Sequence, residues 1–155
     1  MPLSAKGPTV RIVITGADPT HSVEITSPAL LRQFQVWSGP GVEADGQQEP
    51  QGFIIDWLAD GSSRRSTSLP RYKVSFYAKY ANRPLDSQPD HLAYVVWYEP
   101  DFHSRRGYVY LPGKGDEAFA LNAQTIFRGR EGRWFDATDA WNAAVIDRLA
   151  RPPKN

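Results

Sequence analysis

Residues 71–98 read RYKVSFYAKYANRPLDSQPDHLAYVVWY, and this stretch decides the fold. In its first part, aromatic or apolar side chains occupy every second position, namely Tyr72, Val74, Phe76, Ala78 and Tyr80. A period of two is typical of a strand with one face in a core. From Leu92 to Tyr98 every residue is apolar, so we expect both faces of this second strand to be covered.

Strand-like segments continue on both sides of this pair. They are predicted at Thr9–Thr15, 21–26, 53–58, 107–111, 118–121 and 125–128. Turn residues such as Gly16 and Pro19 separate the first two, which predicts a hairpin. Asp56 interrupts the otherwise apolar segment 53–58.

Two segments have helical spacing. Ser27 and Pro28 have the form of an N-cap and a first helical position, which predicts a short helix near residues 28–35. Near the other end, apolar residues recur every three or four positions, which predicts a helix near residues 139–150. Asp139 and Arg148 suit the two ends of its dipole.

These elements predict a mainly β (α+β) fold. We expect an antiparallel β-sandwich or a strongly curled sheet of about seven or eight strands, with both helices packed on it. A doubly wound parallel fold is disfavoured, because the middle of the chain has no room for crossover helices. We expect one domain over residues 1–155, with flexible ends near 1–8 and 151–155 and a mobile loop at 42–51.

Composition excludes several classes of protein. Among 155 residues, 18 basic and 17 acidic residues give a formal charge of +1, so no nucleic-acid partner is expected. There is no cysteine, which excludes disulfides and thiolate chemistry, and no membrane-spanning segment is expected. The compartment and the oligomeric state stay open, with export possible if a leader was removed.

One loop carries residues suited to proton transfer or metal binding. Glu99, Asp101 and His103 lie close together in the sequence, and a carboxylate beside an imidazole can hold a metal or move a proton. The favoured interpretation is a solvated hairpin loop with self-pairing charges. We therefore assign no catalytic residue and no metal ligand, and we expect no cofactor.

The segment 128–136 is the preferred ligand-binding candidate. Arg128 and Arg130 can hold an anionic or polar group, Glu131 can orient them, and Trp134 can supply contact area. The alternative is that Trp134 packs between helix and sheet while the arginines pair with nearby carboxylates.

These observations favour a binding function. We expect a non-catalytic β-rich domain for a polar or anionic small ligand or a protein partner. One alternative is a hydrolase or isomerase that uses Glu99, Asp101 and His103. Another is an assembly or cell-envelope component, whose exposed strand edge pairs with a further chain.

Overall fold

The computed structural model describes residues 8–16, 22–37, 53–62, 64–66, 68–80 and 84–150. The expected mobile loop at 42–51 and almost all of the expected flexible ends lie outside these residues. The prediction of one domain remains a prediction.

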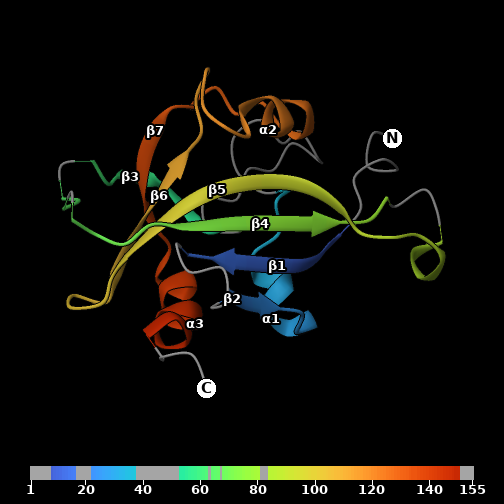
Figure 1. Cartoon of the computed structure of the whole chain (residues 1–155), viewed down its shortest axis with the longest axis horizontal. Helices are drawn as coiled ribbons and strands as arrows, with labels where there is room; N and C mark the ends of the chain where they lie inside the picture. The colour runs from blue at the N-terminus through green and yellow to red at the C-terminus, as the bar shows by residue number, and fades with distance from the viewer. Residues whose placement is uncertain are drawn as a thin grey trace.

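Seven strands join into one open antiparallel sheet in the order β2-β1-β4-β5-β6-β7-β3 (Figure 1). Their bounds are β1 Thr9–Thr15, β2 Ser22–Ile25, β3 Ile55–Asp60, β4 Tyr72–Ala78, β5 His91–Asp101, β6 Arg106–Leu111 and β7 Arg133–Ala137. Strand makes up 39% of the structure and helix 23%, so the predicted mainly β fold class is confirmed. Figure 1 shows β7 steeply inclined to β1 and β4, so the sheet curls strongly towards its β3 edge.

The central strands follow the predicted pattern. Val74, Phe76 and Ala78 of β4 are all buried, as the alternation requires. In β5 the run from Ala93 to Val96 is buried on both faces. The prediction of covered faces therefore holds for the middle of β5.

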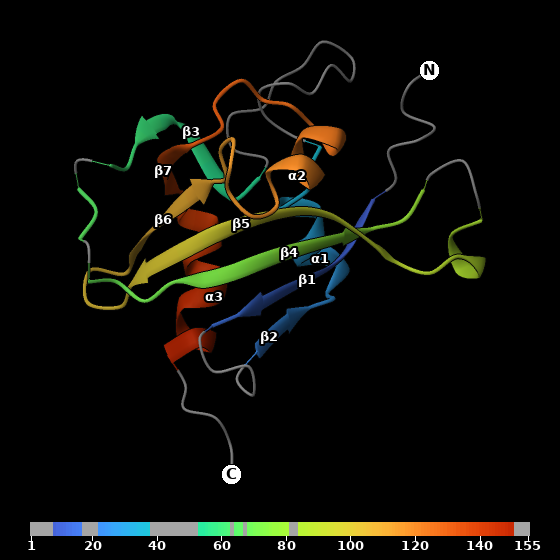
Figure 2. The same ribbon diagram turned by 45° about the horizontal axis from the view of Figure 1, so that its top comes forward.

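Two helices cover one face of the sheet. Helices α1 (Pro28–Gln33) and α3 (Asp139–Ala150) both lie behind the sheet in Figure 2. Phe34, just after α1, meets Trp141 of α3 edge to face with ring centroids 5.0 Å apart. The N-terminus of α3 is capped by Thr138, whose Oγ1 accepts a hydrogen bond from the Trp141 N–H at 3.2 Å. Both predicted helices are confirmed.

The strands predicted at 118–121 and 125–128 are wrong, because a helix, α2 (Phe119–Thr125), begins within the first and ends at the first residue of the second, and residues 126–128 belong to no strand. Asn122 and Thr125 are three residues apart, so they share a face only in a helix. Both side chains bond to backbone groups of β5, at Val95 and Ala93 respectively. Tertiary contact with β5 therefore decides the conformation of this segment. A single 3-10 turn, η3, spans Leu85–Ser87.

No helix within the described parts of the chain is both long and apolar enough to span a membrane.

Candidate functional site

Strand β3 breaks its pairing with β7 midway, and the two cavities of interest border this break. Asp56 lies opposite Asp136, whereas the next paired residue, Asp60, lies opposite Phe135. Residues 57–59 therefore bulge between two paired positions. Bulges re-aim side chains and are frequent beside functional sites.

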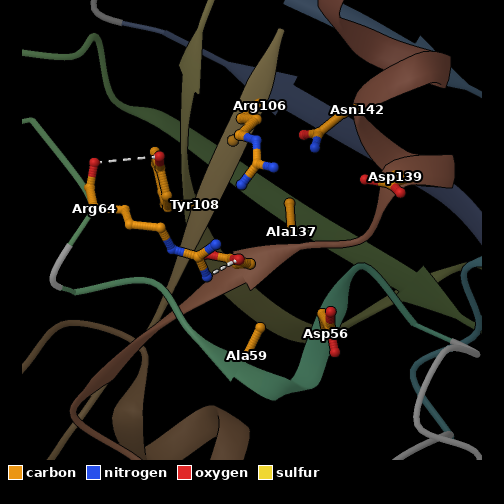
Figure 3. A pocket seen from close by; sticks show the side chains of 10 residues that line it. Asp56, Ala59, Arg64, Arg106, Tyr108, Ala137, Asp139 and Asn142 are labelled. Carbon is orange, nitrogen blue, oxygen red and sulfur yellow. Dashed lines mark hydrogen bonds and ion pairs between the residues drawn. The ribbon is translucent and has the colours of Figure 1, made fainter. Parts of the chain in front are cut away.

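A cavity of about 250 Å³ lies where β3, β6, β7 and the start of α3 meet, and we call it the polar cleft (Figure 3). Its charged lining residues are Asp56, Arg64, Arg106, Asp136 and Asp139. Three carboxylates against two guanidiniums leave a formal excess of one negative charge. Figure 3 shows the guanidinium groups of Arg64 and Arg106 converging on the same region.

Asp136 is the carboxylate of the polar cleft with the most unusual environment. Its Oδ2 forms an ion pair with Arg64, while its Oδ1 is buried without a hydrogen-bond partner among the described residues. Burial raises the pKa of Asp136 and the like charge of Asp56 adds to the rise, although Arg64 and Arg106 oppose it. A buried, unsatisfied carboxylate oxygen needs an explanation, and a shifted pKa in a cleft is typical of functional sites.

Arg106 contributes the second guanidinium of the polar cleft. It begins β6, is exposed, and its side chain makes no hydrogen bond or ion pair with any residue that the structure describes. Its chain neighbour Arg105, by contrast, pairs with Asp147 of α3 at 3.0 Å. The guanidinium of Arg106 therefore offers its five donors to the polar cleft.

A close contact between β6 and α3 fixes the wall of the polar cleft. Asn142 Oδ1 accepts a hydrogen bond from the buried Tyr98 hydroxyl at 2.6 Å. A Cβ at Gly107 would stand 2.5 Å from the Tyr98 ring and 2.6 Å from Asn142 Oδ1. Glycine at position 107 thus lets α3 approach β6, and Asp139 at the start of α3 lines the same cleft.

Of the predicted ligand-binding residues, Arg128 lies inside the core. It is 5% exposed, and its guanidinium donates to the Tyr94 hydroxyl and the Val36 carbonyl, each at 2.8 Å. The rings of Phe53, Trp57 and Tyr94 surround it at about 5 Å. These contacts are those of a structural cation.

Glu131 closes a turn. Its carboxylate accepts the backbone N–H of Arg128 at 2.7 Å and of Gly129 at 2.9 Å. The turn leads into β7 and so sets where Trp134 lies.

Arg130 and Trp134 do come together, in a cavity of about 510 Å³ that we call the aromatic groove. The other members used below are Trp57, Leu58, Asp60, Arg133 and Phe135. The structure thus unites two of the four predicted residues and gives Arg128 and Glu131 contacts within the fold.

Of the candidates Glu99, Asp101 and His103, the first is bound by two arginines and the second is bound by the backbone of the third. Glu99 is 3% exposed and accepts hydrogen bonds from Arg65 at 2.7 Å and Arg71 at 2.9 Å. Asp101 Oδ1 accepts the backbone N–H of His103 at 3.0 Å and so caps the turn after β5, and the His103 side chain is exposed. Within the described ranges no three such groups lie close enough to hold a metal ion.

Sequence reasoning assigned no site role to Asp56, Arg64, Arg106 or Asp136, although Arg106 ends the loop that carries Glu99 and His103 and Asp136 ends the segment 128–136. One signal was present, because Asp56 is a carboxylate inside an apolar strand segment. Which residue lies opposite Asp56 depends on the register between β3 and β7, and the sequence pattern does not determine that register.

Comparison of the chain with models of protein families, with curated proteins and with solved structures gives no match.

Proposed function

We propose that this protein is a binding domain that holds a small polar ligand in the polar cleft and does not transform it. One observation carries the proposal. Among the described residues, neither the guanidinium of Arg106 nor the buried Oδ1 of Asp136 has a hydrogen-bond partner, and both residues line the same cavity. A free donor and a free acceptor in one concave site are the complement of a ligand that has both.

The charge of the lining narrows the ligand class. Because carboxylates outnumber guanidiniums in the polar cleft, an anion without a hydrogen-bond donor for Asp136 would meet net repulsion that nothing offsets. A simple cation would leave Arg106 unused. The best match is a compound with a carboxylate for Arg106 and an adjacent ammonium or hydroxyl group for Asp136, such as an α-amino or α-hydroxy acid.

The test uses four probes with one five-carbon chain: norvaline, 2-hydroxyvalerate, valerate and pentylamine. We expect norvaline and 2-hydroxyvalerate to give saturable shifts in ¹H–¹⁵N spectra at Arg106, Asp136 and Asn142. Valerate and pentylamine each lack one of the two groups, so they should bind about tenfold or more weakly, a difference of about 1.4 kcal/mol.

A matched pair of variants shows where the probes bind. Arg106→Gln should abolish the discrimination in favour of the bifunctional probes, whereas Arg105→Gln removes the same charge one residue away and should leave it intact. Equal affinity of all four probes, or equal behaviour of the two variants, would contradict the proposal.

A second candidate function, general acid–base catalysis, is favoured by the raised pKa of Asp136 opposite Asp56. Two carboxylates whose environments separate their pKa values can divide the roles of acid and base. Wild-type hydrolysis of 4-nitrophenyl esters or glycosides that Asp136→Asn abolishes would favour this function. Binding without turnover would favour the first.

A further inference from the structure

We infer that the aromatic groove is a second binding site, for a small amphipathic anion with an alkyl or aryl body and one carboxylate. It meets the polar cleft only at Ala59 and shares none of its charged residues. This inference therefore does not rest on the proposed function, and the two can fail separately.

The apolar half of the groove is built by the β3 bulge. Trp57 packs edge to face on Phe135 with ring centroids 5.2 Å apart, and both side chains are 6% exposed. Leu58, at the outer point of the bulge, is 81% exposed. A large exposed leucine beside aromatic rings is apolar surface that a ligand body can cover.

The charged half of the groove is cationic. Asp60, its carboxylate, already accepts the backbone N–H of Ser62 at 2.9 Å and the Ser62 hydroxyl at 2.7 Å. Arg130 donates from one nitrogen to the Trp57 carbonyl at 3.3 Å. The Arg133 side chain makes no hydrogen bond or ion pair with any described residue. Two guanidiniums thus keep donors available while the one carboxylate is satisfied.

Trp57, which lines the groove, also carries a hydrogen-bond donor. The Trp57 indole N–H is buried and has no hydrogen-bond partner among the described residues. A buried donor without a partner costs about 1–3 kcal/mol, so an acceptor that reaches it is favoured. The Arg65 guanidinium, which is paired with Glu99, lies 3.6 Å from the centroid of the Trp134 ring and so helps to fix this ring in the wall of the groove.

Charge complementarity decides the occupant. The groove has an excess of positive charge, opposite in sign to that of the polar cleft, which favours an anion. Its apolar surface offers a fully hydrated ion no replacement for its water, so a ligand with an apolar body is favoured. Its volume of about 510 Å³ lies in the range of small-molecule sites. A ligand suits both the charged and the apolar half of the groove if its carboxylate lies between Arg130 and Arg133 and its alkyl or aryl body packs on Trp57 and Leu58.

The experiment compares octanoate with octan-1-ol, which has the same chain and no charge. The five tryptophan indole N–H signals are assigned by Trp→Phe substitution and followed by ¹H–¹⁵N spectroscopy. We expect octanoate to shift the signals of Trp57 and Trp134 saturably and octan-1-ol to bind about tenfold or more weakly.

Variants locate the site. Arg130→Gln/Arg133→Gln should weaken octanoate about tenfold or more, whereas Arg105→Gln/Arg148→Gln removes two charges elsewhere and should not. Arg106→Gln should leave octanoate affinity unchanged even where it abolishes binding in the polar cleft. If the double variant fails to fold, Arg133→Gln alone should still weaken binding about threefold.

Four results would overturn the inference: no saturable octanoate shift, equal affinity for octan-1-ol, shifts confined to other tryptophans, or affinity unaffected by the arginine substitutions.

Discussion

Burial of Asp136 destabilises its anionic form but also leaves a carboxylate oxygen that a ligand can bind. A carboxylate that is buried beside another carboxylate is less stable as an anion than in water, which is why its pKa rises. The Arg64 ion pair offsets only part of this, since one oxygen remains unpaired among the described residues. A ligand donor at that oxygen would remove the remaining cost.

The raised pKa gives stability a definite pH dependence. The folded chain binds the Asp136 proton more tightly than the unfolded chain does, so this contribution is fully present below the ordinary pKa of 3.8. It is lost as pH rises through the raised pKa. We expect the free energy of unfolding of wild type, relative to Asp136→Asn, to fall as pH increases from about 3 to 7.

Asp60, at the end of the neighbouring strand β3, provides a control of opposite sign. Hydrogen bonds from Ser62 lower its pKa, so its contribution is present above the ordinary pKa and is lost as pH falls. Urea unfolding over the pH series measures the free energy of unfolding of wild type minus that of each variant. We expect this difference to rise with pH for Asp60→Asn and to fall with pH for Asp136→Asn. Slopes of the same sign would show that this electrostatic assignment is wrong.

Arg128 and Arg130 should respond differently to the same substitution. Arg128→Met keeps the apolar stem but leaves the Tyr94 hydroxyl and the Val36 carbonyl without this donor. We expect a loss of about 2–4 kcal/mol, which lowers Tm by roughly 5–15 °C. Arg130→Met, at an exposed position, should change stability by less than about 0.5 kcal/mol. Equal Tm values for the two variants would contradict the structural role of Arg128.

At the scale of elements, α2 takes the place of a strand beside β5. β6 pairs with β5 only from Trp97 onward, so the part of β5 that precedes Trp97 lacks a neighbouring strand on that side. Asn122 fills this place, because its amide accepts the Val95 N–H at 2.8 Å and donates to the Val95 carbonyl at 2.6 Å. One side chain thus satisfies two backbone groups of the sheet.

Asn122→Ala should therefore destabilise the protein by about 2–4 kcal/mol, because two buried backbone groups lose their partner. Gln124→Ala, on the exposed side of α2, is the control and should have little effect. Denaturant unfolding measures the loss, and hydrogen exchange at the Val95 amide should accelerate only in Asn122→Ala. Unchanged exchange there would argue against the bridge.

The sequence predicts most elements but not their partners. Alternation in β1 and β4 and the helical spacing of α3 are local patterns, so they can be read without knowing the fold. Helix α2 could not be read, because its conformation depends on backbone groups of β5 that are distant in sequence. Arg128 was predicted to hold a ligand for the same reason, because its partners Val36 and Tyr94 lie far from it in the sequence.

The polar cleft was the hardest feature to predict, because it depends on contacts between segments that are distant in the sequence. Its charged residues come from four separate segments, which the pairing of β7 with β3 and β6, the β3 bulge and the β6–α3 contact bring together. Asp56 could have been singled out as a carboxylate in an apolar strand, yet Arg106 could not be distinguished from Arg105.

At the scale of the whole molecule, the two edge strands are poorly suited to pairing with another chain. β2 has only 4 residues, and β3 is broken by its bulge. Asp56 and Asp60 of β3 also bond N–H groups of their own chain, at Leu58 and Ser62. Short, bulged and charged edges resist strand addition.

We therefore expect a monomer whose mass by light scattering does not change with concentration. A mass that rises with concentration and falls when a proline replaces Leu58 would favour the assembly alternative instead.

The central claim is that Arg106 and Asp136 together form a ligand site, and a crystal structure with norvaline tests it most directly. We expect the norvaline carboxylate within roughly 3 Å of the Arg106 guanidinium and its ammonium group within hydrogen-bond distance of Asp136 Oδ1. Norvaline bound elsewhere, or a polar cleft that holds only water at saturating norvaline, would contradict the claim.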